Sequence, residues 1–157
     1  MPDHPDLRSD VLNALQLLIR TPSVNPTLAP DEGCTETAIA NAARDWLLAH
    51  GVRSWTDEAV PGRPNAVGEL GGGNGPVLVF CAHLDTVGTA GMTIPPFEPR
   101  LEGGRVYGRG SYDMKGSAAA IMAGAVMLAA EGLLRGRRMP GRPHGDHRGF
   151  FQRRPGL

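Results

Sequence analysis

The sequence predicts an α/β fold with a mostly parallel central sheet flanked by helices, and three observations lead to this prediction. Apolar residues recur at helical spacing in two segments before residue 50. The run from Val77 to Ala82 is apolar throughout, which is typical of a strand covered on both faces. A third helical segment, from about Ser117 to Glu131, is apolar nearly all round, so we expect it to be buried.

The first helix is expected to end at Arg20 and to begin near Ser9 or Asp10, either of which can cap it. Prolines at positions 22 and 26 then impose a loop. The second helix is expected from about Thr35 to His50, with Gly51 in the left-handed position after it. The predicted core-facing residues are Val11, Leu12, Leu15, Leu18 and Ile19 in the first helix, and Ile39, Ala42, Ala43, Trp46 and Leu47 in the second.

The middle of the chain reads as strands joined by turns. Residues 52–58 and 65–70 are candidate strands, and the glycines of residues 71–75 form a flexible turn into the Val77–Ala82 strand. A phosphate-binding loop is disfavoured because no Gly-Lys-Ser/Thr follows and the next element is a strand. Residues 100–107 read as a hairpin with Gly-Gly at its tip. Cys81 lies inside the predicted buried strand, where we expect a thiol to pack as a small apolar group.

The charge is distributed unevenly along the 157 residues, although the formal net charge is zero. Residues 1–134 hold nine Lys/Arg and fifteen Asp/Glu, whereas residues 135–157 hold seven Arg and one Asp. We therefore separate an N-terminal folded segment, residues 1–134, from a basic Arg/Gly/Pro tail, residues 135–157, that is expected to be disordered. The tail has two interpretations: a segment that binds nucleic acid or an acidic partner, or the product of a reading frame that slipped near Arg135. We favour the second.

The predicted location is the cytoplasm. The N-terminus has no apolar segment of the kind that a secretory signal needs. The longest apolar run, residues 118–130, is shorter than the ~20 residues that span a bilayer. Cys34 and Cys81 are the only cysteines, so no disulfide framework is expected and a reducing compartment fits.

Two segments carry the candidate site. His83 and Asp85 follow the apolar Val77–Ala82 run, at the strand end where open α/β sheets bind ligands. Asp113 lies in a glycine-flanked turn before the third helix. Imidazole and carboxylate groups suit zinc, and Asp85 can orient the His83 ring. Each residue also has a structural interpretation: His83 as a hydrogen-bonded strand end, Asp113 as a helix cap and Lys115 as a solvated side chain.

Several motifs in order closely resemble the zinc-dependent amidohydrolase and exopeptidase family that includes acetylornithine deacetylase, succinyl-diaminopimelate desuccinylase, aminoacylase and carboxypeptidase G. The resemblance covers about residues 8–134. It is carried by Arg20-Thr21-Pro22-Ser23-Val24-Asn25-Pro26, by Ala82-His83-Leu84-Asp85-Thr86-Val87, by Pro96-Phe97-Glu98-Pro99 and by Gly103-Gly104-Arg105-Val106-Tyr107-Gly108-Arg109-Gly110-Ser111-Tyr112-Asp113-Met114-Lys115-Gly116.

The resemblance implies specific roles. His83 is similar to a histidine ligand of one metal, Asp113 to the carboxylate that bridges two metals, and Asp85 to the catalytic carboxylate that orients the histidine. It also implies two Zn²⁺ ions, with Co²⁺ as a substitute, and hydrolysis of amide bonds in N-acyl amino acids or peptides. Some relatives have a cis peptide after the bridging aspartate, here the Asp113–Met114 bond. A homodimer is expected for the parent family.

One departure from the family is important for activity. The family places an adjacent Glu-Glu pair beyond the bridging aspartate, as general base and metal ligand, but no Glu follows Glu131 here. We therefore expect an incomplete catalytic domain of a dinuclear metallohydrolase, truncated and inactive as written. The alternatives are a complete small hydrolase that uses His144, Asp146 and His147, and a non-enzyme that binds nucleic acid or an acidic partner through its tail.

Overall fold

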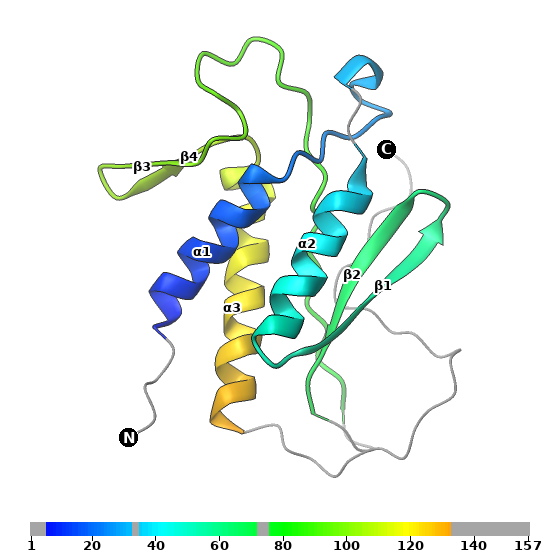
Figure 1. Ribbon diagram of the computed structural model, residues 1–157, viewed down its shortest axis with the longest axis vertical. Coiled ribbons are helices and arrows are strands. Elements are labelled where there is room, and N and C mark those ends of the chain that lie inside the picture. The colour runs from blue at the N-terminus through cyan, green and yellow to red at the C-terminus, as the bar shows by residue number, and fades with distance from the viewer. Residues whose placement is uncertain (1–5, 33–34, 72–75, 133–157) are drawn as a thin grey trace.

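The computed structural model describes residues 6–32, 35–71 and 76–132, and Figure 1 shows their arrangement. In chain order the elements are α1 (Leu7–Arg20), the short 3-10 helix η1 (Pro30–Glu32), α2 (Glu36–Ala49), β1 (Arg53–Val60), β2 (Arg63–Glu69), β3 (Arg100–Glu102), β4 (Arg105–Tyr107), the π-helical turn η2 (Ser111–Lys115) and α3 (Gly116–Glu131). Cys34, most of the glycine run and the 135–157 tail lie outside the described residues, as do the predictions made for them.

Helix α1 begins one turn before the predicted start. Asp6, rather than Ser9 or Asp10, is the N-cap, and its carboxylate accepts hydrogen bonds from the Arg8 backbone N–H at 3.2 Å and the Ser9 hydroxyl at 2.7 Å. The Ser9 hydrogen bond is the main cause that lowers the pKa of Asp6. The helix ends as predicted at Arg20, because the residue before Pro22 is held in an extended conformation.

Helix α2 agrees closely with its prediction. It spans Glu36–Ala49 with Thr35 at the N-cap, and Gly51 follows it with φ of 81°. Three of the five predicted core residues, Ile39, Ala43 and Leu47, are buried, and Ala40 joins them. Trp46 is only half-buried and instead stacks on His50, with 4.1 Å between the ring centroids.

Both sheets in the described part of the chain are antiparallel hairpins. β1 pairs with β2 from Arg53–Glu69 to Val60–Arg63, and β3 pairs with β4 as predicted for residues 100–107. The predicted mostly parallel central sheet is therefore not what these residues form. The one parallel pairing among them is a single bridge between Val24 and Thr86.

The predicted buried strand Val77–Ala82 is wrong for this structure. These residues form no regular strand, and Val77, Leu78, Val79 and Phe80 are 42–70% exposed. Cys81 is exposed as well, so its predicted burial is also wrong. A strand of a parallel sheet needs hydrogen-bonded neighbours along its edges and helices over its faces. In the described residues β1 and β2 pair only with each other, which leaves the 76–82 segment without a partner strand.

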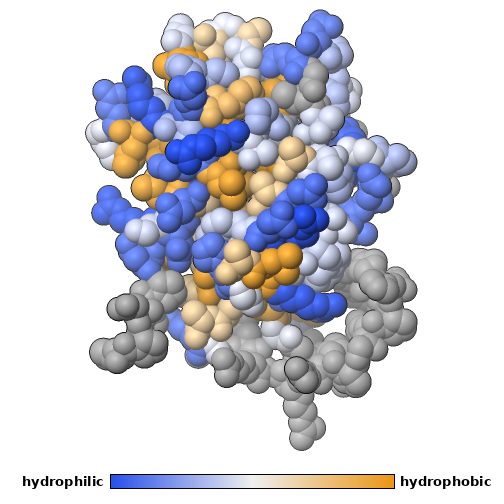
Figure 2. Space-filling view, viewed as in Figure 1, coloured by the Kyte–Doolittle hydropathy of each residue, from blue (hydrophilic) through white to orange (hydrophobic). Residues whose placement is uncertain are grey.

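The core lies between the three helices and one face of the β1–β2 hairpin. α1 packs against α3 and α2, while the hairpin packs against α2 (Figure 1). Leu18, Ile39, Leu47 and Met122 are the large apolar side chains at its centre, together with Ile19 and Val52, and each is at most 1% exposed. Figure 2 shows separate apolar patches between hydrophilic side chains on the viewed face.

Helix α3 packs into the core along one face and is half-buried or exposed on the rest, so the expectation that it is buried nearly all round is met only in part. The stretch Ser111–Glu131 has 21 residues and is apolar enough, by length and composition alone, to cross a membrane. It is not one continuous helix, because Asp113 and Met114 have non-helical backbone angles, and α3 itself has 16 residues. Its buried residues Ala118, Ala119, Met122, Ala123 and Val126 belong to the helix-packed interior, which is how the core helix of a globular domain behaves.

Candidate metal centre

The loop after α1 places the segment that carries His83 and Asp85. Ser23 and Asn25 flank the parallel bridge: the Thr86 N–H donates to the Ser23 carbonyl at 2.9 Å, and the Asn25 N–H donates to the Thr86 carbonyl at 2.8 Å. The fully buried Ser23 hydroxyl also donates to the Leu84 carbonyl at 2.7 Å. Prolines 22 and 26 keep this loop extended, so it can pair with residues 84–86 as a short strand would.

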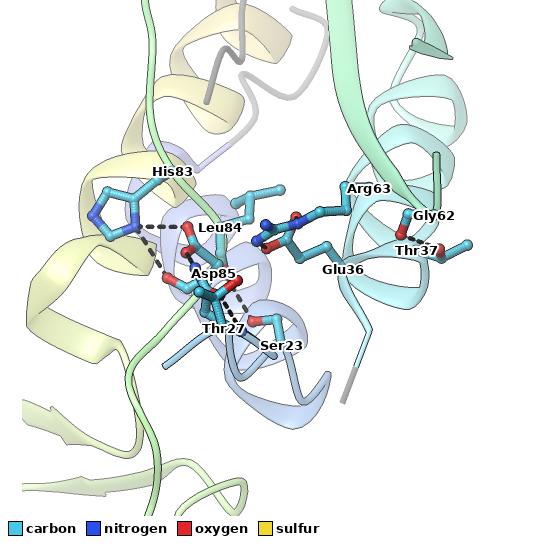
Figure 3. Close-up of polar contacts among 10 residues, drawn as sticks. Ser23, Thr27, Glu36, Thr37, Gly62, Arg63, His83, Leu84 and Asp85 are labelled. Carbon is cyan, nitrogen blue, oxygen red and sulfur yellow. Dashed lines mark hydrogen bonds and ion pairs between the residues drawn. The ribbon is translucent and has the colours of Figure 1, made fainter. Parts of the chain in front are cut away.

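His83 lies between two carboxylates. Its Nδ1 is 3.0 Å from the Asp85 carbonyl oxygen and 3.4 Å from Asp85 Oδ1, and its Nε2 is 3.0 Å from Asp113 Oδ1. Figure 3 shows the imidazole beside Asp85. An Nδ1–H that donates to Asp85 leaves Nε2 facing the Asp113 carboxylate, where a shared proton or a metal ion can join the two.

Asp113 reaches His83 because glycines shape the turn around it. Gly110 has φ of 79°, and a Cβ on it would lie 2.8 Å from a methyl group of Thr86. A Cβ on Gly116 would lie 2.6 Å from the Ser111 carbonyl oxygen. The Asp113–Met114 peptide bond is cis, as the resemblance implied. The N-cap residues of η2 and α3 are Gly110 and Lys115, so Asp113 is not a helix cap, and its side chain is 80% exposed.

The interpretation of Lys115 as a solvated side chain is wrong. Lys115 is fully buried, and its ammonium donates to the carbonyls of Leu18 at 2.7 Å and Thr21 at 3.1 Å. Pro22, four residues after Leu18 and just beyond the end of α1, lacks an N–H and cannot donate to the Leu18 carbonyl. Lys115 replaces that donor and brings a positive charge to the helix C-terminus, where it is favourable. It thereby ties the Asp113 turn to the end of α1.

An ion pair lies on the other side of Asp85. Arg63 on β2 donates through Nε to Glu36 on α2 at 2.9 Å, and a second guanidinium nitrogen makes a shorter contact with the same carboxylate (Figure 3). Hydrogen bonds to Glu36 raise the pKa of Arg63, and the charge of Asp85 adds to this. The pair fixes the β1–β2 hairpin to α2 beside the candidate site.

The site opens into a pocket of about 330 Å³. His83, Asp85 and Asp113 line it together with Arg109 and Tyr112, and Tyr112 is 96% exposed. Nitrogen and oxygen donors of this kind suit zinc or a similar transition metal, so the residues present fit such an ion. Within the described ranges, however, no group of three or more His, Cys, Asp or Glu side chains is arranged to hold a metal. The assignment of His83 and Asp113 as metal ligands therefore stays a prediction.

Glu32 holds the loop that follows the site. Its carboxylate accepts the Thr89 backbone N–H at 2.7 Å and the Thr89 hydroxyl at 2.9 Å. The backbone hydrogen bond is the main cause that lowers the pKa of Glu32, and the hydroxyl adds to it. A lowered pKa in the folded state means that this contribution to stability is complete above the ordinary value of about 4.5 and is lost as the pH falls through the folded-state pKa.

We expect the Thr89 amide proton to report this ionisation. Its NMR chemical shift should titrate with a midpoint below 4.5, because the amide donates a stronger hydrogen bond to the charged Glu32 carboxylate than to the protonated group. In Glu32→Gln the shift should stay flat over the same range. A wild-type midpoint at or above 4.5 would contradict the hydrogen-bonded arrangement.

Sequence reasoning missed two residues that hold the site together. Asn25 donates from Nδ2 to Asp85 Oδ2 at 2.7 Å, and Lys115 joins the Asp113 turn to α1. Each had only a weak signal in the sequence: Asn25 precedes Pro26, and Lys115 is the only lysine of the chain and immediately precedes an apolar helix.

Comparison with known proteins identifies the class. Residues 79–139 match the model of peptidase family M20/M25/M40. A metallo-carboxypeptidase of the M20 family from Sulfolobus solfataricus superposes with a TM-score of 0.68 at 22% identity, over 81% of this chain and 29% of that one. Human carnosine dipeptidase 1 superposes with a TM-score of 0.55 at 24% identity, over 80% of this chain and 29% of that one. Residues 79–139 therefore match the peptidase M20 family, and the two solved structures share the fold of this chain.

The curated relatives of the chain carry the name of one enzyme. A succinyl-diaminopimelate desuccinylase from Methylocella silvestris is 35% identical over 130 residues, which cover 81% of this chain and 32% of the relative. The enzyme of the same name from Thioalkalivibrio sulfidiphilus is 34% identical over 144 residues, which cover 90% of this chain and 32% of the relative. The chain spans about a third of the length of these relatives. Because they are hydrolases by name, they give no support to the nucleic-acid-binding alternative.

Proposed function

We propose that this chain carries one part of the metal centre of an M20-type hydrolase that cleaves amide bonds in N-acyl amino acids or peptides. The observation that carries the proposal is the contact between His83 Nε2 and Asp113 Oδ1, two residues 30 positions apart, at the mouth of one pocket. The names of the curated relatives make an N-succinyl amino acid the preferred substrate class, with N-acetylornithine as the second.

In this proposal His83 and Asp113 would hold zinc, and Co²⁺ would substitute for Zn²⁺. The metal, when bound, polarises the scissile carbonyl and activates water. Asp85 accepts the Nδ1–H of His83, so that Nε2 keeps its lone pair for the ion. Val87, Arg109 and Tyr112 border the pocket where a small substrate would lie.

We further propose that the chain as written binds metal but does not turn over substrate. A general base within reach of the attacked carbonyl is worth about 10²–10⁴ in rate, and no glutamate follows Glu131 to supply it. A cytoplasmic location and the family's homodimer remain predictions.

The test combines two measurements on the purified full chain. Co²⁺ titration followed by visible absorption should show saturable binding that is lost in His83→Ala. Hydrolysis of N-succinyl-diaminopimelate and N-acetylornithine should not exceed controls that contain metal alone. Turnover above these controls would disprove the inactivity, while the absence of any His83-dependent binding would disprove the metal centre.

A further inference from the structure

We propose that Asn25 is a positioning residue that fixes the Asp85 carboxylate and, through it, the His83 imidazole. This inference rests on the proposed metal centre. Asn25 comes from the loop after α1, 60 residues before Asp85, and its side chain is almost fully buried at 7% exposure. Its contacts differ from those of a residue that only fills space.

Every polar group of Asn25 is engaged. Its backbone N–H donates to the Thr86 carbonyl at 2.8 Å, and its backbone carbonyl accepts the N–H groups of Leu28 and Ala29, each at 3.0 Å. Its side-chain Oδ1 accepts the Thr27 N–H at 2.9 Å, and Nδ2 donates to Asp85 Oδ2 at 2.7 Å. The residue is therefore held from both its backbone and its side chain.

The orientation of the Asn25 amide follows from these partners. The Thr27 N–H can only donate, so the atom that faces it must be the amide oxygen. The Asp85 carboxylate can only accept while ionised, so the atom that faces it must be the amide nitrogen. A flipped amide would place two donors together on one side and two acceptors together on the other, and both contacts would be lost.

Because of Asn25, the two carboxylate oxygens of Asp85 have different partners. Oδ2 accepts from Asn25, which leaves Oδ1 turned toward His83 Nδ1 at 3.4 Å. With one oxygen held, the carboxylate cannot rotate away from the ring. His83 Nδ1 also contacts the Asp85 backbone carbonyl at 3.0 Å, so the carbonyl and the carboxylate of Asp85 together keep Nε2 directed at Asp113, the orientation that a shared metal would require. Groups that orient a metal-bound histidine typically change metal affinity 10–100-fold when altered.

Asn25→Asp is the sharpest variant, because it keeps the oxygen that accepts from Thr27 and changes only the group that donates to Asp85. It replaces a donor with a carboxylate facing another carboxylate. Asn41→Asp on α2 is the matched control: Asn41 Oδ1 likewise accepts a hydrogen bond, from Arg44 at 2.9 Å, and the substitution makes the same change in charge away from the site. Asn25→Ala removes the contact without adding a charge.

Two readouts distinguish positioning from stability. In the metal-free protein, the Asp85 carboxyl ¹³C and His83 ring ¹⁵N resonances should shift in Asn25→Asp and Asn25→Ala but not in Asn41→Asp. Co²⁺ affinity should fall about 10–100-fold in both Asn25 variants, with melting temperatures measured alongside. Unchanged Asp85 and His83 resonances in folded Asn25 variants would overturn the inference, even if the wild-type chain binds Co²⁺. Shifted resonances in a chain that binds no Co²⁺ would support it while disproving the metal centre.

Discussion

His83→Ala is expected to lower the affinity of the chain for Zn²⁺ and Co²⁺ by more than about 100-fold, the upper range found when only a supporting residue is altered. The substitution removes the one imidazole of the site and leaves Asp113, which is 80% exposed, without its partner at 3.0 Å. Asp113→Asn should have a similar effect, because a neutral amide is a poorer ligand than a carboxylate. Isothermal titration calorimetry with each metal measures both changes.

His50→Ala provides the control. His50 lies at the end of α2, where its Nδ1 contacts the Trp46 carbonyl at 2.7 Å and its ring stacks on Trp46. The His50→Ala substitution removes an imidazole, as His83→Ala does, but His50 does not line the pocket. Equal loss of metal affinity in the His50 and His83 variants would show that the ion binds histidines unspecifically.

Lys115→Met is expected to lower the free energy of unfolding by about 1–3 kcal/mol. The variant keeps an unbranched apolar side chain in the buried space but removes the ammonium that donates to the Leu18 and Thr21 carbonyls. Since Pro22 offers no N–H, the Leu18 carbonyl would then be a buried acceptor without a donor. Urea unfolding followed by circular dichroism measures the change.

Arg20→Met is the matched control for this prediction. Arg20 is the other cation at the end of α1, but it is exposed and its side chain makes only a 3.4 Å contact with Gln16. We expect a change within about 0.5 kcal/mol, as is usual for a surface substitution. Equal urea midpoints for Lys115→Met and the wild type would show that the buried ammonium does not stabilise the end of α1.

The elements that the sequence predicted well are those whose ends depend on local chemistry. Pro22 ends α1, Gly51 follows α2 with positive φ, and Gly132 does the same for α3. His83 and Asp113 were predicted as partners, and the structure brings them together. That prediction depended on the family resemblance, since the spacing alone also allowed structural roles for each residue.

The predictions that failed depend on partners distant in the chain. An apolar run such as Val77–Ala82 is buried only where other strands and helices cover it, and periodicity does not show whether they do. Lys115 is buried because the end of α1 lacks a donor, a condition set by Pro22 in another part of the sequence. The role of Asn25 likewise depends on its hydrogen bond to Asp85, which lies far along the chain.

The contacts of the site connect very distant parts of the chain, and this has a consequence for the order of folding. Asn25 reaches Asp85 across 60 residues, His83 reaches Asp113 across 30, and Lys115 reaches Leu18 across 97. Closing such loops carries an entropic cost that local helix formation does not. The helices can therefore form early, whereas His83 and Asp113 meet only when the tertiary structure is nearly complete. An isolated peptide that contains either motif would not reproduce the site.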